Sequence, residues 1–170
     1  MVEIQHTGSL FYLPQNGDEA AAITTNGVIR KNGSAVLGKG QALEAKKLVP
    51  GLEHQLGEYL RRYGNRAFYM GVHRVGEHLT SLVTFPTKHH YRDNSDLDLI
   101  AESALQVKEI ASKFQLTKVY LPPVGCGLGN LDYEKQVRPV LHQILDDDRF
   151  VVVLGYKGSE ENQNRTAEVN

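Results

Sequence analysis

Apolar segments of two kinds alternate along this chain, and the alternation strongly constrains how it can fold. Short apolar runs typical of strands lie at 20–25, 118–121 and 150–154, whereas apolar residues at helical spacing lie at 52–63 and 97–114. Strands that alternate with helices predict an α/β/α sandwich around a mixed, largely parallel sheet. In such sheets ligands bind beyond the carboxyl ends of the strands, where the chain passes from strand to helix.

The same patterns predict the remaining elements. The long helix is expected to begin at Asn94 or Ser95, because both side chains can accept hydrogen bonds from the first amides of a helix. One or two short strands are expected within 2–13. Further strands are expected at 68–75 and 79–85, and further helices at 42–48 and 132–145.

The length of 170 residues fits one domain. We expect a single domain over 1–157, followed by a polar and flexible tail over 158–170. The one cysteine, Cys126, excludes an intramolecular disulfide framework and favours a reducing, cytoplasmic setting. The first residues lack the features of a signal peptide, and no apolar run is long enough to span a bilayer. A monomer with no membrane partner is therefore expected.

The formal net charge is −1, which argues against a broad electrostatic grip on nucleic acid. A small ligand, or a modification that the protein recognises directly, remains compatible with this charge. The run Asp146-Asp147-Asp148 is interpreted as a solvated turn, and the histidines show no spacing typical of a metal site. We expect neither a metal nor a bound cofactor.

Two glycine-rich segments follow expected strands. The first runs over 24–42 (TTNGVIRKNGSAVLGKGQA) and the second over 122–132 (PPVGCGLGNLD). Glycine lets backbone amides approach a ligand closely, and successive amides form an anion-binding nest. A helix that begins behind each loop would add the positive end of its dipole. Each segment alone could equally be a set of tight turns, and neither matches a Walker A or a full Rossmann pattern.

Taken together, the segments resemble those of macro domains. The heptapeptide at 125–131 (GCGLGNL) resembles the phosphate loop of a branch that includes terminal ADP-ribose protein glycohydrolase and the DarG-type antitoxins. A third segment at 84–92 (TFPTKHHYR), followed by Ser95 and Leu97, resembles the DarG-type strand end that carries a catalytic lysine. The resemblance covers about 23–154.

The resemblance implies a surface cleft for ADP-ribose. Lys88 is in the position of the catalytic lysine, and Asn32 is expected near the distal ribose. Binding residues are expected in both glycine-rich segments: Asn26, Asn32, Gly38, Lys39 and Gly40 in the first, and Gly125, Cys126, Gly127, Leu128, Gly129 and Asn130 in the second.

Two positions depart from the family pattern. Gly8-Ser9-Leu10 stands where many macro domains have an Asp that holds the adenine amino group, so the resemblance implies no such contact here. Gly129 stands where the terminal glycohydrolase has an Asp, and the DarG-type loop has Gly there. The second departure favours the DarG-type relatives, which remove ADP-ribose from DNA, over the terminal glycohydrolase, which acts on protein.

The chemistry expected of the site centres on Lys88. Its amine could attack the ring-opened distal ribose, or its charge could stabilise the departing group. Attack requires a lowered pKa, since an ordinary lysine titrates near ~10.4. His89, His90 and Tyr91 are possible substrate contacts, with only one of the adjacent histidines expected to face the cleft. Cys126 is expected to contribute backbone rather than a catalytic thiolate.

Three functions remain open on the sequence. The first is a hydrolase that removes ADP-ribose from a modified macromolecule, with DNA as the first candidate. The second is hydrolysis of ADP-ribose 1''-phosphate or a related metabolite. The third is a binding module that recognises ADP-ribose without turnover. The motif around Lys88 favours an enzyme, because a binding module does not need that lysine.

Overall fold

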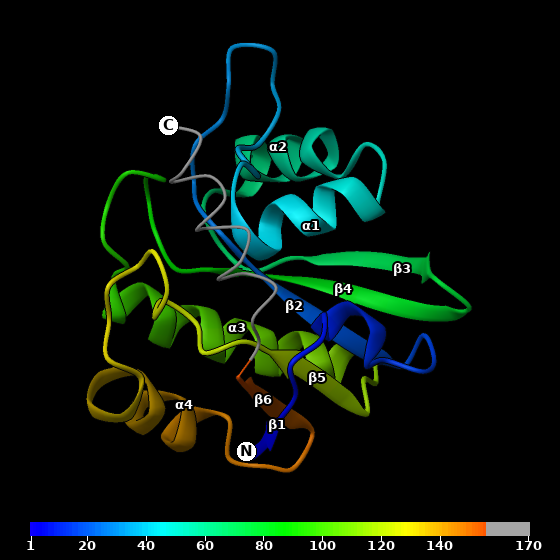
Figure 1. Ribbon diagram of the computed structural model, residues 1–170. Coiled ribbons are helices and arrows are strands. Elements are labelled where there is room, and N and C mark those ends of the chain that lie inside the picture. The colour runs from blue at the N-terminus through cyan, green and yellow to red at the C-terminus, as the bar shows by residue number, and fades with distance from the viewer. Residues whose placement is uncertain (156–170) are drawn as a thin grey trace.

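A six-stranded sheet with the order β1-β6-β5-β2-β4-β3 forms the centre of the computed structural model, which describes residues 1–155 (Figure 1). The edge strand β3 pairs antiparallel with β4, and every other neighbouring pair is parallel. The prediction of a mixed, largely parallel sheet is therefore confirmed. The strands are β1 (Val2–Gln5), β2 (Glu19–Thr25), β3 (Tyr69–Val75), β4 (His78–Pro86), β5 (Lys118–Leu121) and β6 (Phe150–Leu154).

Helices cover both faces of this sheet, as Figure 1 shows. The helices α1 and α2 lie over one face, and α3 and α4 lie over the other. The helical segments are η1 (Leu10–Tyr12), α1 (Gly40–Leu48), α2 (Leu52–Tyr63), α3 (Leu97–Lys113), the π-helical turn η2 (Tyr133–Val137) and α4 (Arg138–Ile144). Among residues 1–155, no helix has both the length and the apolar character needed to cross a bilayer.

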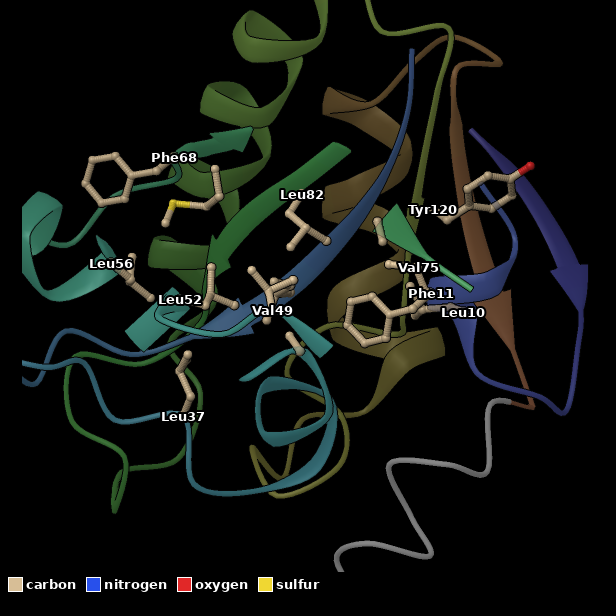
Figure 2. Packing of buried hydrophobic residues seen from close by; sticks show 14 of the residues in the cluster. Leu10, Phe11, Leu37, Val49, Leu52, Leu56, Phe68, Val75, Leu82 and Tyr120 are labelled. Atoms are coloured by element: carbon tan, nitrogen blue, oxygen red, sulfur yellow. The ribbon is translucent and has the colours of Figure 1, made fainter. Parts of the chain in front are cut away.

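The central strand β2 divides the interior into two cores. Side chains alternate along a strand, so Ala21 and Ile23 pack on the side of α1 and α2, whereas Ala20 and Ala22 pack on the side of α3 and α4. All four are fully buried. Figure 2 shows the first core, to which Leu52 and Leu56 of α2 and Leu82 of β4 belong.

The segment at 2–13 forms one of the one or two expected strands, β1, followed by the 3-10 turn η1. The structure corrects two other local predictions. Helix α3 is capped by Asp96, whose carboxylate accepts from the amides of Asp98 at 2.9 Å and Leu99 at 3.2 Å, and not by Asn94 or Ser95. Pro139 has no amide hydrogen, so it cannot donate the α-helical hydrogen bond to the carbonyl four residues earlier. The segment expected as one helix therefore begins as a π-helical turn.

The expected domain boundary at 157 and the expected tail at 158–170 lie outside the described residues.

Candidate functional site

A cleft of about 890 Å³ lies beyond the carboxyl ends of β2, β4 and β5. Both glycine-rich segments line it, together with the residues that follow β4. Its size is within the ~300–1,000 Å³ range of small-molecule sites. The position agrees with the rule that ligands bind at this edge of a parallel sheet.

The first glycine-rich segment presents the beginning of α1 to the cleft. The cap residue Lys39 makes no side-chain bond to the helix, and Gly40 begins it with a φ of 56°. The first amides of a helix have no partner within the helix, so here they can donate to a ligand. Gln41 anchors this end, because its Nε2 donates to the carbonyl of Ala22 at 2.6 Å and its Oε1 accepts from the amide of Thr24 at 3.3 Å.

The side chain of Asn26 holds the same segment closed. Its Nδ2 donates to the carbonyl of Val36 at 3.1 Å, and its Oδ1 accepts from the amide of Val28 at 3.0 Å. Asn26 lines the cleft, as do Gly38, Lys39 and Gly40. Because both ends of the amide group are engaged, Asn26 shapes the wall of the cleft.

Asn32 lies in the turn at the tip of this segment. Its Oδ1 accepts from the amide of Ser34 at 3.1 Å and from the hydroxyl of Ser34 at 2.7 Å. Asn32 is not among the described residues that line the cleft. This location does not fit the expected contact with the distal ribose.

The second glycine-rich segment packs against the start of α3. Gly125 has a φ of 77°, which favours glycine, and the carbonyl of Gly129 accepts from the amide of Ser95 at 2.9 Å. A Cβ on Gly129 would overlap the Ser95 hydroxyl and the Gly125 carbonyl. Asn130, with a φ of 63°, donates from Nδ2 to Asn94 Oδ1 at 2.8 Å. Gly129 therefore cannot be replaced by the Asp of the terminal glycohydrolase without moving the loop.

The helix that follows the second segment does not offer free amides to a ligand as α1 does. The Asp132 carboxylate accepts from the amide of Lys135 at 2.8 Å and so caps η2 itself. Its negative charge also opposes the positive end of the helix dipole. Only the first segment brings an uncapped helix to the cleft.

Lys88 crosses the cleft between the two segments. It follows β4, and its Nζ donates to the carbonyl of Leu128 at 3.4 Å. Its own carbonyl accepts from Asn65 Nδ2 at 3.0 Å, which fixes the backbone. Burial lowers the pKa of Lys88; the charge of Asp93 partly opposes this shift, and the charge of Lys39 adds to it. A lysine with a lowered pKa has more of its neutral, nucleophilic form near neutral pH.

The residues after Lys88 divide between the cleft and its outer side. Tyr91 lines the cleft, and the described lining includes neither His89 nor His90. His89 instead places Nε2 3.7 Å from Asp96 Oδ2. His90 accepts from the amide of Arg92 at 3.1 Å, and its ring lies 4.4 Å from that of Tyr91.

Cys126 is half-buried in the second segment, and its Sγ donates to the carbonyl of Val124 at 3.3 Å. Burial, together with the charge of Asp132, raises the pKa of the thiol to about 11. The thiolate is therefore scarce at neutral pH, in line with the expected backbone role.

The cleft is locally positive although the whole chain carries a formal net charge of −1. Its described lining holds the cations Arg30, Lys39, Lys88 and Arg92 and the single acid Asp93. Sequence reasoning did not name Arg30, although it lies within the first glycine-rich segment. Several polar residues were also not selected from the sequence as ligand contacts, although they line the cleft: Thr24, Thr25, Gln41, Thr87, Asn94 and Ser95. No group of three possible metal ligands occurs in residues 1–155.

No protein-family model matches this chain. Two curated proteins named DNA ADP-ribosyl glycohydrolase, from Mycobacterium bovis and Mycobacterium tuberculosis, are each 30% identical to it over 121 residues. The match covers 70% of this chain and 34% of theirs, so the chain spans about a third of the length of the curated relatives it matches.

Solved structures share the fold over most of the chain. The macrodomain of Mycobacterium tuberculosis DarG superposes with a TM-score of 0.65 at 27% identity, covering 88% of this chain and 97% of that one. The chain is a macro domain, and it resembles those of DarG. The Thermus aquaticus DarG macrodomain (TM-score 0.65, 22% identity, covering 89% and 97%) has the same fold. So does Thermosipho africanus DarTG in complex with ADP-ribose (TM-score 0.65, 22% identity, covering 79% and 37%). Within this macro domain, the cleft that holds Lys88 is therefore the candidate site.

Proposed function

We propose that this macro domain is a hydrolase that removes ADP-ribose from a modified macromolecule, with DNA as the first candidate. The observation that carries the proposal is the position of Lys88: its amine spans the cleft to the carbonyl of Leu128, and its pKa is lowered by burial. A module that only bound ADP-ribose would have no need of an amine held in this state.

The charges and amides of the cleft suit the diphosphate of ADP-ribose. The start of α1, which has no side-chain cap, lines the cleft with Lys39 and Gly40, and the second glycine-rich segment lines it as well. Both features favour an anion. With the diphosphate between the two segments, the distal ribose lies toward Lys88.

The reaction breaks the bond between the anomeric carbon of the distal ribose and the acceptor atom. The acceptor leaves with the electron pair and takes up a proton, while water supplies the hydroxyl of the released ADP-ribose. Lys88 acts in one of two ways. As a neutral amine it attacks the ring-opened sugar, and water later releases the adduct; as an ammonium it stabilises the departing acceptor.

Two observations favour DNA as the acceptor. The curated relatives at 30% identity are named DNA ADP-ribosyl glycohydrolase. The site has Gly129 where the terminal ADP-ribose protein glycohydrolase has an Asp, and the packing of Gly129 against Ser95 leaves no room for that side chain. The cleft lies within one chain, which fits a monomer, and the single cysteine of the sequence fits a reducing, cytoplasmic setting.

The proposal is tested by incubating the purified protein with a single-stranded oligonucleotide that carries a thymidine-linked ADP-ribosyl group. We expect free ADP-ribose and the unmodified oligonucleotide as products. ADP-ribose 1''-phosphate, tested in parallel, distinguishes the metabolite enzyme. If calorimetry shows that ADP-ribose binds but neither substrate is turned over, the proposal is wrong and the domain is a binding module.

A further inference from the structure

A second hollow lies outside the ADP-ribose cleft, between the end of α2, the start of β3 and the second half of α3. Its volume is about 440 Å³. We name it the aromatic groove, because five of its lining residues carry rings: Tyr59, Tyr63, Phe68, Tyr69 and Phe114. The rest of the lining is Arg66, Ala67, Gln106, Glu109, Ile110 and Lys113.

Two rings of the aromatic groove, those of Tyr63 and Phe114, are exposed, and both lie against other rings of the groove. Tyr63 is 62% exposed and Phe114 is 41% exposed. Phe114 stacks on Tyr69 with 3.9 Å between ring centroids, and Tyr63 lies 6.2 Å from Phe68. Rings that are already ordered lose little conformational entropy when a flat ligand stacks on them.

The cations of the aromatic groove have no acidic partner among the described residues. Arg66 forms no hydrogen bond or ion pair with residues 1–155, and Lys113 lies with its Nζ 5.6 Å from the Phe114 ring centroid. In contrast, Arg61 and Arg62 at the end of α2 are both paired with Glu58, at 2.7 and 2.8 Å. Unpaired cations beside exposed rings are the combination that binds single-stranded nucleic acid, since bases stack and phosphates pair.

The aromatic groove begins next to the backbone of Lys88. Asn65 Nδ2 donates to the carbonyl of Lys88 at 3.0 Å, and Arg66 is the next residue in the chain. Gly27 packs closely on the Asn65 side chain, and its amide donates to the carbonyl of His89 at 3.1 Å. The same short connection therefore holds the catalytic lysine and places the first cation of the groove.

We infer that the aromatic groove holds bases of the single strand that carries the ADP-ribosyl group, on one side of the modified nucleotide. This inference rests on the proposed function for its DNA substrate. The modified nucleotide lies at the cleft, the strand passes over Asn65, and neighbouring bases stack on Tyr63 and Phe114 while their phosphates pair with Arg66 and Lys113. The long helix α3 forms the far wall of this path.

Binding is tested with unmodified, fluorescent oligothymidylate by anisotropy at low salt. We expect the wild type to bind, and Tyr63→Ala and Arg66→Ala each to weaken binding about tenfold, in keeping with the effect of losing one stacking ring or one cation. Arg66→Ala is also expected to lower the salt-dependence slope by about 0.7, the value for one phosphate contact on a single strand. The matched controls are Tyr12→Ala and Arg62→Ala, which remove an exposed ring and an exposed cation outside the groove.

Turnover supplies a second measurement on the same variants. We expect Tyr63→Ala and Arg66→Ala to reduce kcat/KM for a modified strand about tenfold and to leave release from an isolated modified nucleoside unchanged. Failure of the wild type to act on either substrate contradicts the proposed function, while the anisotropy result still decides on the groove. The inference is overturned if oligothymidylate does not bind, or binds equally to the wild type and both groove variants, as it would if the groove held a protein partner.

Discussion

At the scale of single residues, burial lowers the pKa of the Lys88 amine, and two charged neighbours of opposite sign adjust it. Lys39 lowers the pKa of Lys88 and Asp93 raises it, while burial provides the largest lowering. A positive neighbour disfavours the ammonium form and a negative neighbour favours it. The neutral fraction of Lys88 is therefore set by residues of both the first glycine-rich segment and the turn after β4.

Replacement of these neighbours is expected to move the pKa of Lys88 in opposite directions. Lys39→Gln removes a positive charge and raises the pKa, whereas Asp93→Asn removes a negative charge and lowers it. The pKa is followed by NMR titration of isotope-labelled lysine, with the Lys88 signal assigned from Lys88→Arg. Lys31→Gln, on an exposed lysine outside the described cleft lining, is the control. Shifts of the same sign in both variants would contradict this electrostatic account.

Cys126 is expected to be dispensable for chemistry. Since burial raises the pKa of its thiol to about 11, little thiolate is present at neutral pH. Cys126→Ala should keep ADP-ribose release within about twofold of the wild type, because it leaves the backbone of the second segment in place. Labelling of the wild type with iodoacetamide should be slow at neutral pH and faster as the pH rises toward 11. Loss of turnover in Cys126→Ala would assign the thiol a direct role.

At the scale of elements, the two glycine-rich segments differ in how much they depend on glycine. A Cβ at Gly129 would overlap Ser95 and the backbone of Gly125, whereas a Cβ at Gly38 meets only Val36, at 3.9 Å. The second segment is thus packed tightly against the start of α3. The first segment has room for a side chain at Gly38, although not at Gly27, where a Cβ would lie 2.9 Å from the Asn65 side chain.

Alanine at these two positions should therefore have unequal effects. Gly129→Ala is expected to reduce the free energy of unfolding by roughly 1–3 kcal/mol, the usual cost of overpacking, and to weaken ADP-ribose binding. Gly38→Ala is expected to leave the unfolding free energy almost unchanged. Urea denaturation and calorimetry with ADP-ribose measure both quantities. Equal stability of the two variants would mean that the packing of Gly129 against Ser95 is unimportant.

The sequence predicts the elements around the cleft well, because local patterns determine them. Buried strands such as 20–25 are apolar throughout, and parallel strands bring the following loops to one edge of the sheet. This rule places both glycine-rich segments and Lys88 together. The direction of one side chain is harder to predict, since it depends on partners far along the chain. Asn32 accepts hydrogen bonds from Ser34 and is not among the described cleft residues, and His89 lies beside Asn65 and Asp96.

The first residue of α3 is also hard to predict from the sequence, because it depends on contacts with distant residues. The sequence offers Asn94, Ser95 and Asp96 in succession as possible caps. Tertiary contacts hold the first two in other positions, since Asn94 Oδ1 accepts from Asn130 and the amide of Ser95 donates to Gly129, while the Ser95 hydroxyl has no hydrogen-bond partner among the described residues. The cap therefore falls to Asp96. Propensity alone does not rank these three residues.

At the scale of the whole molecule, the near-neutral net charge hides an uneven distribution. Cations gather in the cleft around Lys88, and further unpaired cations line the aromatic groove beside it. The sheet makes this arrangement possible, because α1 and α3 begin on opposite faces but at the same edge. An ADP-ribosylated strand would meet positive charge along this edge, and acidic residues elsewhere in the chain bring the formal net charge to −1.

The central claim is that Lys88 carries out the hydrolysis in this cleft. The most direct measurement is single-turnover release of ADP-ribose from a thymidine-linked ADP-ribosylated oligonucleotide, with wild type and Lys88→Ala compared and ADP-ribose binding measured by calorimetry on the same preparations. We expect Lys88→Ala to slow release by at least about 100-fold, as for loss of a catalytic proton-transfer group, while ADP-ribose still binds. Release by Lys88→Ala at the rate of the wild type would contradict the claim.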